Sequence, residues 1–189
     1  FKQIVVAMGA GSTAALSANA ADLNYNNVQG SYNSVDIDGA DLDGFGIKGS
    51  LKFNDMFYGI AGYESYSEGD TSLDETSVGL GFRSSVGAKT DWINELSYVH
   101  DSADAGYYGD VSDSGYRVAT GLRSMVGENV ELTGKLNYAD VGDFGNGIGV
   151  NLGGAYHINE TFGITAGYDY ADRGDIDLNS WNVGARVSF

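Results

Sequence analysis

The sequence predicts an all-β fold: a closed antiparallel up-and-down transmembrane β-barrel of about ten strands, with eight strands as the alternative. Three observations lead to it. The chain has 29 glycines among 189 residues and no proline, which argues against a helical bundle because each helix-interior glycine costs about 1 kcal/mol relative to alanine. From residue 25 onward apolar residues recur with a period of two, the period of strands. Short and long connections alternate, which is typical of membrane barrels.

The charge balance and the composition exclude several classes of protein. The chain has 26 acidic and 10 basic residues, a net charge of −16. This balance disfavours nucleic acid as a partner, because phosphate binding requires a basic surface. A hydrophobic share of 42% with 12% aromatic residues argues against disorder. The absence of cysteine excludes a disulfide framework and a thiolate zinc site.

The first 20 residues differ from the rest and are expected to be part of a cleaved signal peptide. Lys2 supplies a positive start, and residues 4–16 form an apolar stretch that is too short for a spanning helix. Residues 18–20 read Ala-Asn-Ala, the small-x-small pattern that precedes signal-peptidase cleavage. We therefore expect the barrel to occupy residues 21–189. The alternative is a short amphipathic helix that stays attached.

Alternation places ten strands along the chain. They are expected at 25–34, 44–53, 56–66, 75–85, 91–100, 114–125, 129–139, 147–157, 161–170 and 179–189. In the second, Phe45, Ile47 and Leu51 share one face, whereas Lys48 and Lys52 take the other. Each segment is near the 9–11 residues that a tilted strand needs to cross a bilayer.

The connections justify pairing these strands into hairpins. Short connections at 54–55, 87–91, 127–129 and 159–160 each precede a strand that runs from an apolar start to a tyrosine. Longer acidic stretches at 35–43, 67–74, 101–113, 140–146 and 171–178 separate the other strand pairs. We expect the short turns at the periplasmic end and the long loops at the external end.

Aromatic residues gather at both strand ends, as membrane interfaces favour. Those near the long connections are Tyr32, Tyr63, Tyr98, Tyr116, Tyr138, Tyr168 and Trp181. Those near the tight turns are Phe53, Phe57, Trp92, Tyr156, Phe162 and Phe189. The alternative is that these rings fill the ends of a soluble barrel.

Ionic residues fall on the face opposite the apolar one. The candidates for a lumen charge network are Lys48, Glu64, Arg83, Glu95, Arg117, Arg123, Glu131, Lys135, Asp169 and Arg186. In a membrane barrel this face lines the lumen, where opposite charges must pair to offset desolvation. A soluble barrel with its polar face in water would show the same pattern.

The last strand carries the residues of a family resemblance. Trp181, Val183, Ala185, Val187 and Phe189 alternate up to an aromatic C-terminal residue. This strand resembles the terminal strand of bacterial outer-membrane barrels, in which it is read by the barrel-assembly machinery. Residues 23–32 and 43–53 also resemble the small OmpA/OmpX-like superfamily and, more narrowly, the Ax-type diffusible-signal-regulated outer-membrane family.

The resemblance implies an integral protein of the Gram-negative outer membrane that serves membrane integrity or surface and host interaction without catalysis. Its implied partners are outer-membrane lipid, lipopolysaccharide and the assembly machinery, and we expect a monomer with a largely filled lumen. Two other functions stay open: a small porin-like channel for ions or small solutes, and a soluble ligand-binding barrel in the periplasm.

Two polar features invite other chemistry. His100 and Asp101 lie at a rim where omptin-type proteases use His and Asp groups, but the chain is much shorter than those enzymes and we expect no catalytic activity. Acidic residues in the external loops suit Ca²⁺ or Mg²⁺, and the candidate ligands are Asp36, Asp38, Asp41 and Asp43. No other cofactor is expected.

Overall fold

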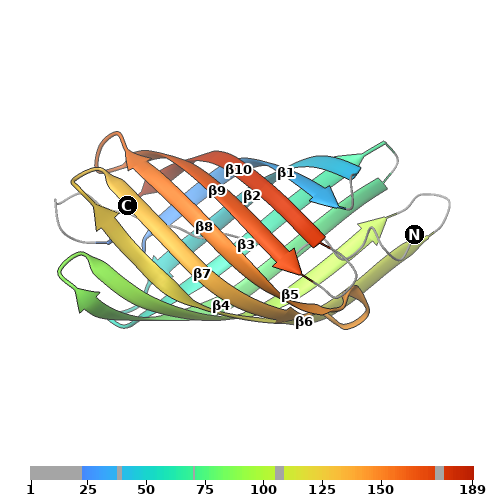
Figure 1. Cartoon of the computed structure of the whole chain (residues 1–189), viewed down its shortest axis with the longest axis horizontal. Coiled ribbons are helices and arrows are strands. Elements are labelled where there is room, and N and C mark those ends of the chain that lie inside the picture. The colour runs from blue at the N-terminus through green and yellow to red at the C-terminus, as the bar shows by residue number, and fades with distance from the viewer. Residues whose placement is uncertain (1–22, 38–39, 70, 105–108, 173–176) are drawn as a thin grey trace.

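A computed structural model describes residues 23–37, 40–69, 71–104, 109–172 and 177–189, which form a single β-barrel (Figure 1). The predicted signal peptide lies outside the described residues. The strands are β1 (Asn27–Ile37), β2 (Ala40–Lys52), β3 (Phe57–Glu68), β4 (Thr71–Gly87), β5 (Thr90–Asp104), β6 (Asp110–Val126), β7 (Val130–Asp140), β8 (Asn146–His157), β9 (Phe162–Asp172) and β10 (Asp177–Ser188). Within the described residues, no helix has the length and apolar composition needed to cross a bilayer.

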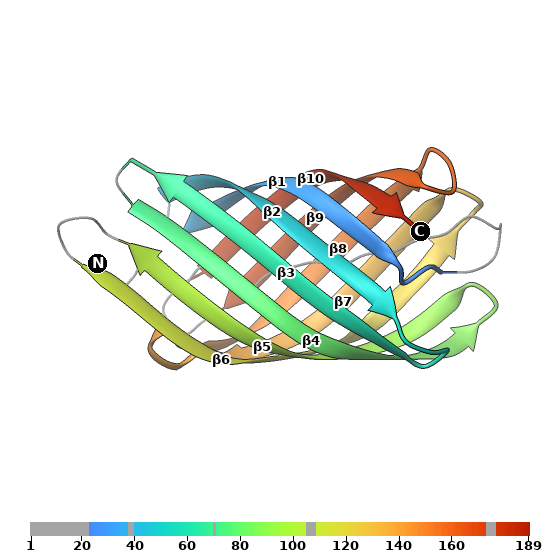
Figure 2. The same ribbon diagram turned by 180° about the vertical axis from the view of Figure 1, so that it is seen from behind.

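The sheet closes on itself through β1 and β10, which lie side by side in Figure 2. These two strands pair antiparallel from Asn27 opposite Ser188 to Ile37 opposite Leu178. Every other pair joins neighbours in sequence, so the up-and-down topology and the count of ten strands are confirmed. Closure removes the open sheet edge that would leave backbone groups unpaired in lipid.

The short connections lie at one end of the barrel together with the C-terminus (Figure 1). Two of them are fixed by an asparagine that replaces missing backbone partners. The side-chain oxygen of Asn54 accepts hydrogen bonds from the backbone N–H groups of Met56 and Phe57 at 2.8 and 2.9 Å. Asn159 accepts from Thr161 and Phe162 in the same way. Local side-chain bonds of this kind favour tight turns.

At the opposite end the predicted long loops are largely wrong. Within 35–43, strand pairing continues to Ile37 opposite Ala40, and within 67–74 it continues to Glu68 opposite Thr71. Within 101–113, β5 and β6 stay paired to Asp104 opposite Asp110. These extensions project past the aromatic ring positions, where outward acids such as Asp36, Asp41 and Asp104 are exposed. Acidic residues therefore do not end a strand there, as the sequence interpretation assumed.

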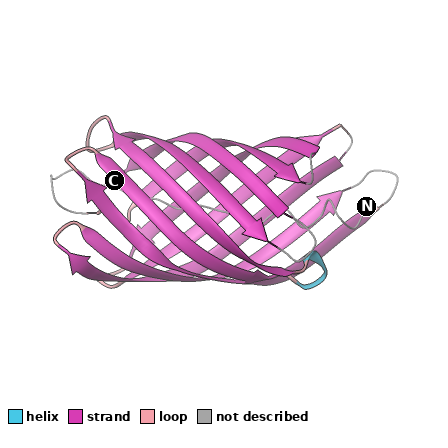
Figure 3. Cartoon of the chain, in the orientation of Figure 1, coloured by secondary structure: helices cyan, strands magenta, loops and turns pink. Residues whose placement is uncertain are grey.

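A real loop joins β7 to β8 and contains the short 3-10 helix η3 (Gly142–Phe144), drawn in cyan in Figure 3. Gly142 and Gly145 have φ values of 50° and 84°, a backbone region that favours glycine. The turn directs Val141 and Phe144 inward, and both are fully buried.

The outer surface of the barrel is apolar. Phe45 is 60% exposed, Leu96 59% and Val187 42%, an arrangement that water would penalise and acyl chains would not. Every aromatic residue expected at the two strand ends is exposed on this surface: Tyr32, Tyr63, Tyr98, Tyr116, Tyr138, Tyr168, Trp181, Phe53, Phe57, Trp92, Tyr156, Phe162 and Phe189. We call these two sets the loop-end girdle and the turn-end girdle.

The face assignment predicts a depth-dependent cost for arginine. Leu96 and Val86 are equally exposed at 59%, but Leu96 lies between the girdles whereas Val86 lies beside a tight turn. Leu96→Arg should destabilise the barrel in lipid vesicles by about 2–4 kcal/mol and Val86→Arg by about 0–1 kcal/mol. Denaturant titration of the two variants measures both values, and equal costs would contradict the membrane placement.

Candidate functional site

The interior of the barrel is the candidate site, and a charged band occupies its middle. All ten residues of the expected lumen network belong to the inward face; eight are buried, and the side chains of Arg83 and Arg117 are 18% and 11% exposed. The eight buried residues are Lys48, Glu64, Glu95, Arg123, Glu131, Lys135, Asp169 and Arg186. The pleat alone produces this sorting, because successive residues of a strand point to opposite faces.

Ion pairs within the band connect strands. Lys48 Nζ lies 2.9 Å from Glu64 Oε1, and Lys135 Nζ donates to Glu95 Oε2 at 2.8 Å across the intervening strand β6. Tyr58 donates to the other oxygen of Glu95 at 2.9 Å. Glu95, on β5, thereby holds side chains from β3 and β7, which helps to fix the shape of the cylinder.

The two tightest pairs are bidentate. The guanidinium of Arg123 donates to both oxygens of Glu131 at 3.0 and 2.8 Å, and that of Arg117 donates to both oxygens of Glu75 at 3.0 and 2.6 Å. Arg186 reaches the same Glu131 at 3.8 Å and donates to Gln29 at 2.8 Å. This fork geometry suits arginine in dry surroundings.

Sequence reasoning missed two acidic members of the band, Glu75 and Asp91. Glu75 pairs with Arg117, and Asp91 accepts from Arg83 Nη1 at 3.0 Å. Both are buried. Each is the first residue of an expected strand, and Asp91 was also counted in the connection 87–91, so neither was included in the lumen network. The alternation itself was sufficient to find them, since each stands an even number of residues from an inward glutamate or serine on its own strand.

A row of polar side chains, most of them amides, connects strands β7 to β10 inside the barrel. Asn137 donates to Asn151 at 2.8 Å, and Asn151 donates to Asp169 Oδ1 at 2.7 Å. Asn182 lies 3.5 Å from the other Asp169 oxygen, so four consecutive strands share one chain of hydrogen bonds. Asp169 is thus held by amides, whereas the other acids of the band are paired with cations.

Apolar side chains seal the loop end of the bore, which the sequence analysis did not predict. They are Val35, Leu42, Tyr66, Leu73, Val99, Ala103, Val141, Phe144, Ala171 and Leu178. Most belong to the strand extensions that had been assigned to loops, and Val141 and Phe144 come from the β7–β8 connection. Inward and outward residues continue to alternate in these extensions beyond the loop-end girdle. Their outward residues are polar, whereas their inward residues form an apolar plug.

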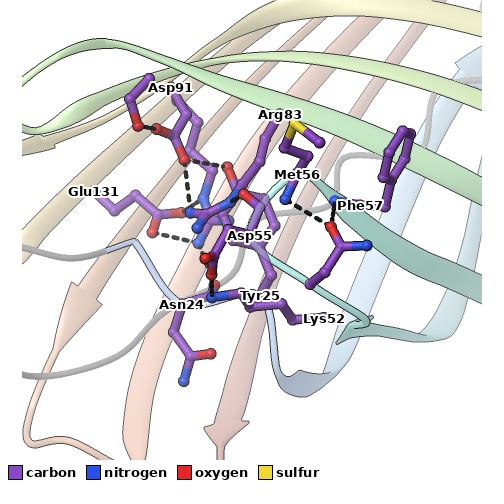
Figure 4. Close-up of polar contacts among 12 residues, drawn as sticks. Asn24, Tyr25, Lys52, Asp55, Met56, Phe57, Arg83, Asp91 and Glu131 are labelled. Atoms are coloured by element: carbon purple, nitrogen blue, oxygen red, sulfur yellow. Dashed lines mark hydrogen bonds and ion pairs between the residues drawn. The ribbon is translucent and has the colours of Figure 1, made fainter.

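A tyrosine before β1 seals the turn end. The guanidinium carbons of Arg123 and Arg83 lie over the ring of Tyr25, 4.2 and 4.7 Å from its centroid. The hydroxyl of Tyr25 donates to Asp91 at 2.9 Å (Figure 4), and its ring centroid lies 4.6 Å from that of Tyr58. Cations over an aromatic ring make favourable cation–π contacts.

The backbone around Tyr25 is fastened as well. Arg123 donates to the carbonyl of Asn24 at 2.7 Å, and Ser50 donates to the carbonyl of Tyr25 at 2.8 Å. The backbone N–H of Phe189 donates to the carbonyl of Asn26 at 3.1 Å. The segment before β1 thus joins the C-terminal residue to the charged band. Tyr25 was expected at the start of a strand; in the structure it acts as a plug.

Little open space is left inside. The cavity in the charged band, lined by Lys48, Glu95 and Arg117 among others, has a volume of about 30 Å³, room for about two water molecules. A hollow of about 430 Å³ lies at the turn-end mouth and is lined by Lys52, Asp55 and other polar residues (Figure 4). Tyr25, which also lines this hollow, stands between it and the inner cavity.

The structure separates the His–Asp pair at the rim. His100 belongs to the outer face of β5 with Trp92 and Tyr98, whereas Asp101 points inward and is fully buried. His100 Nδ1 lies 2.9 Å from the hydroxyl of Ser114. Neighbouring residues of one strand face opposite sides, so these two side chains cannot act on one substrate.

The expected metal ligands are only partly described. Asp36 and Asp41 lie opposite each other and are exposed, as is Asp43, whereas Asp38 lies outside the described residues. No group of three or more His, Cys, Asp or Glu side chains that could hold a metal ion occurs in the described ranges. The residues of the expected assembly signal, Trp181, Val183, Ala185, Val187 and Phe189, are exposed on the outer face of β10 and the following C-terminal residue.

Together, the fold and the interior define a small up-and-down barrel with an apolar exterior and a filled, ion-paired lumen. No protein-family model matches the chain, and no curated protein matches it in sequence.

Solved membrane barrels have a similar fold. The NanC porin is 12% identical with a TM-score of 0.47, and the match covers 87% of this chain and 100% of NanC. Ail, the attachment invasion locus protein of Yersinia pestis, is 18% identical with a TM-score of 0.42, covering 87% and 97%. Neisserial surface protein A is 15% identical with a TM-score of 0.45, covering 87% and 96%. At these identities the likeness concerns the fold, and the narrower Ax-type resemblance stays a prediction.

Removal of a buried carboxylate tests the charged band. Glu131→Gln leaves Arg123 and Arg186, which are 2% and 0% exposed, without a charged partner, and should cost about 3–5 kcal/mol of folding free energy. The matched control is Asp55→Asn. Asp55 pairs with Lys52 at 2.7 Å but its side chain is 93% exposed, so the loss should stay below about 1 kcal/mol. Similar values for both variants in vesicle unfolding would contradict the paired interior.

Proposed function

We propose that the chain is a non-catalytic integral barrel of the outer membrane with a closed lumen, which serves membrane integrity or contact at the cell surface. The observation that carries this proposal is the sealing of the bore at both ends around the charged band. Phe144 closes the loop end and Tyr25 the turn end, and each is at most 2% exposed. An interior filled in this way favours a structural role over transport.

The apolar exterior supports the membrane location. It lies between two aromatic girdles, and its strands of 11–17 residues are long enough for the 9–11 residues needed to cross a bilayer. Short turns at one end support a periplasmic position for that end. Assembly by the barrel-assembly machinery and residence as a monomer among phospholipid and lipopolysaccharide complete the proposal.

The charge distribution supports a surface role for the loop end. Described basic residues lie inside the barrel or at the turn end, whereas the loop end exposes Asp36, Asp41, Asp43, Glu68, Asp104, Asp110, Asp143 and Asp172. Such a surface repels anions and attracts cationic partners. It therefore suits contact with a basic partner at the cell surface.

Planar-bilayer recording tests the closed lumen. Wild-type protein should insert and give no steady single-channel current, because Tyr25 and Phe144 are buried at the two ends of a bore whose inner cavity measures only about 30 Å³. Heat-modifiable migration on gels, measured on the same preparation, shows that the barrel has folded and inserted. Steady conductance of the inserted protein would overturn the closed lumen and support the small channel.

The C-terminal residue gives a second test, of assembly. Phe189→Ala keeps the backbone bond to Asn26 but removes an exposed ring. We expect the amount of folded protein in outer membranes of cells to fall several-fold, while refolding in detergent is unchanged. The control is Ile158→Ala, another exposed apolar residue at the same end. If Phe189→Ala reached the wild-type amount in outer membranes, the proposed role of Phe189 in the assembly signal would be wrong.

A further inference from the structure

A hollow in the outer wall over β6, β7 and β8 has a volume of about 540 Å³, within the roughly 300–1,000 Å³ of small-ligand sites. Its lining includes Trp92, Thr120, Leu122, Gly134, Leu136, Val150 and Leu152. Gly134 forms the floor because it faces outward without a side chain. A Cβ added there would meet only Leu152 Cδ2, at 3.7 Å, so the space is open.

A polar cluster stands at one edge of this hollow: Trp92 and Thr120 line it, and Asn94 lies next to Thr120 on the neighbouring strand β5. Trp92 Nε1 donates to the hydroxyl of Thr120 at 3.0 Å, and that hydroxyl donates to the side-chain oxygen of Asn94 at 2.9 Å. An indole can only donate, so the chain begins at Trp92 and runs through the hydroxyl of Thr120 to Asn94. It ends on the oxygen of Asn94 and leaves the amide N–H groups of that residue as donors.

Within the described residues, no hydrogen bond engages the amide nitrogen of Asn94. Asn94 lies on the outer face of β5 two residues from Trp92, a member of the turn-end girdle. Two residues of strand span about 7 Å, less when the strand is tilted. The amide therefore stands just inside the girdle, where a bilayer presents the glycerol esters of its lipids.

A hollow with a polar end and an apolar trough is complementary to an amphipathic molecule. We propose that this hollow binds a diacyl glycerophospholipid. An ester carbonyl accepts a hydrogen bond from the Asn94 amide, and one acyl chain lies over Gly134 between Leu122, Leu136 and Leu152. The proposal rests on the membrane location proposed above.

The hydrogen-bond chemistry favours lipid over a second copy of the chain. A donor without a partner in hydrocarbon costs free energy, and ester carbonyls are the acceptors available at this depth. A second hollow of about 470 Å³ lies over β1 to β4, with Val28, Leu51, Val78 and Leu80 among its outward lining. The outward residues of this second hollow are apolar. Of the two hollows, the one at Gly134 is therefore the one with a polar cluster at its edge.

Fluorescence quenching tests the proposal, because the chain has only two tryptophans and Trp92 lines the hollow. In a Trp181→Phe background, the barrel is folded into vesicles of diester and diether phosphatidylethanolamine, with bromine on the chains of one or the other. We expect the diester lipid to be preferred at Trp92 by roughly fivefold, as one net hydrogen bond provides.

Three variants locate the effect. Asn94→Leu should abolish the preference for the diester lipid, and Gly134→Leu should reduce quenching by both lipids because it fills the trough. Gly30→Leu is the matched control; Gly30 is exposed with nothing within 4 Å of an added Cβ, and this variant should behave like the parent.

Equal quenching by both lipids in the inserted parent protein, or a preference that survives Asn94→Leu, would overturn the lipid site. So would quenching by neither lipid together with crosslinked dimers, which would assign the hollow to a second copy. Heat-modifiable migration is recorded on each sample. Failure to insert would refute the membrane location itself, whereas insertion without a lipid preference would refute only this site.

Discussion

Pairing of the first strand with the last is the constraint on which the rest of the structure depends. Eleven residue pairs join β1 to β10, and without them two edges would expose unpaired backbone groups to the bilayer. Once the cylinder is closed, the pleat assigns the residues of each strand alternately to the outer surface or to the lumen. The apolar exterior, the charged band and both plugs follow from that assignment.

Paired charged side chains fill the interior of the closed barrel. Charged residues are expensive to bury alone, so each cation of the band is placed against an acid or an amide. Glu131 holds Arg123 and Arg186, and Glu95 holds Lys135 and Tyr58. Tyr25 and Asn26 then tie this network to the segment before β1 and to the C-terminal residue. Both strands of the seam are thereby fixed to the same interior at the turn end.

The period of two predicted ten strands and sorted their residues into two faces. The positions of the charges and of the aromatic rings then assigned residues such as Arg186 to the inside and the girdles to the outside. The prediction failed where acidic stretches were assigned to loops. Asp36 and Asp104 lie in strands, because beyond the loop-end girdle an outward acid meets water. The plugs could not be predicted, since Tyr25 and Phe144 depend on contacts between residues far apart in sequence. The hollow at Gly134 likewise becomes visible only when neighbouring strands are in register.

Disulfide formation across the seam tests the closed cylinder most directly, and the chain has no cysteine of its own. Val28 and Val187 lie directly opposite each other on β1 and β10, whereas Ile164 lies one strand further away on β9. Cysteines at 28 and 187 should form an intramolecular disulfide in the folded, membrane-inserted protein, and cysteines at 28 and 164 should not. Absence of the first bond, or equal yield of both, would contradict the closed barrel.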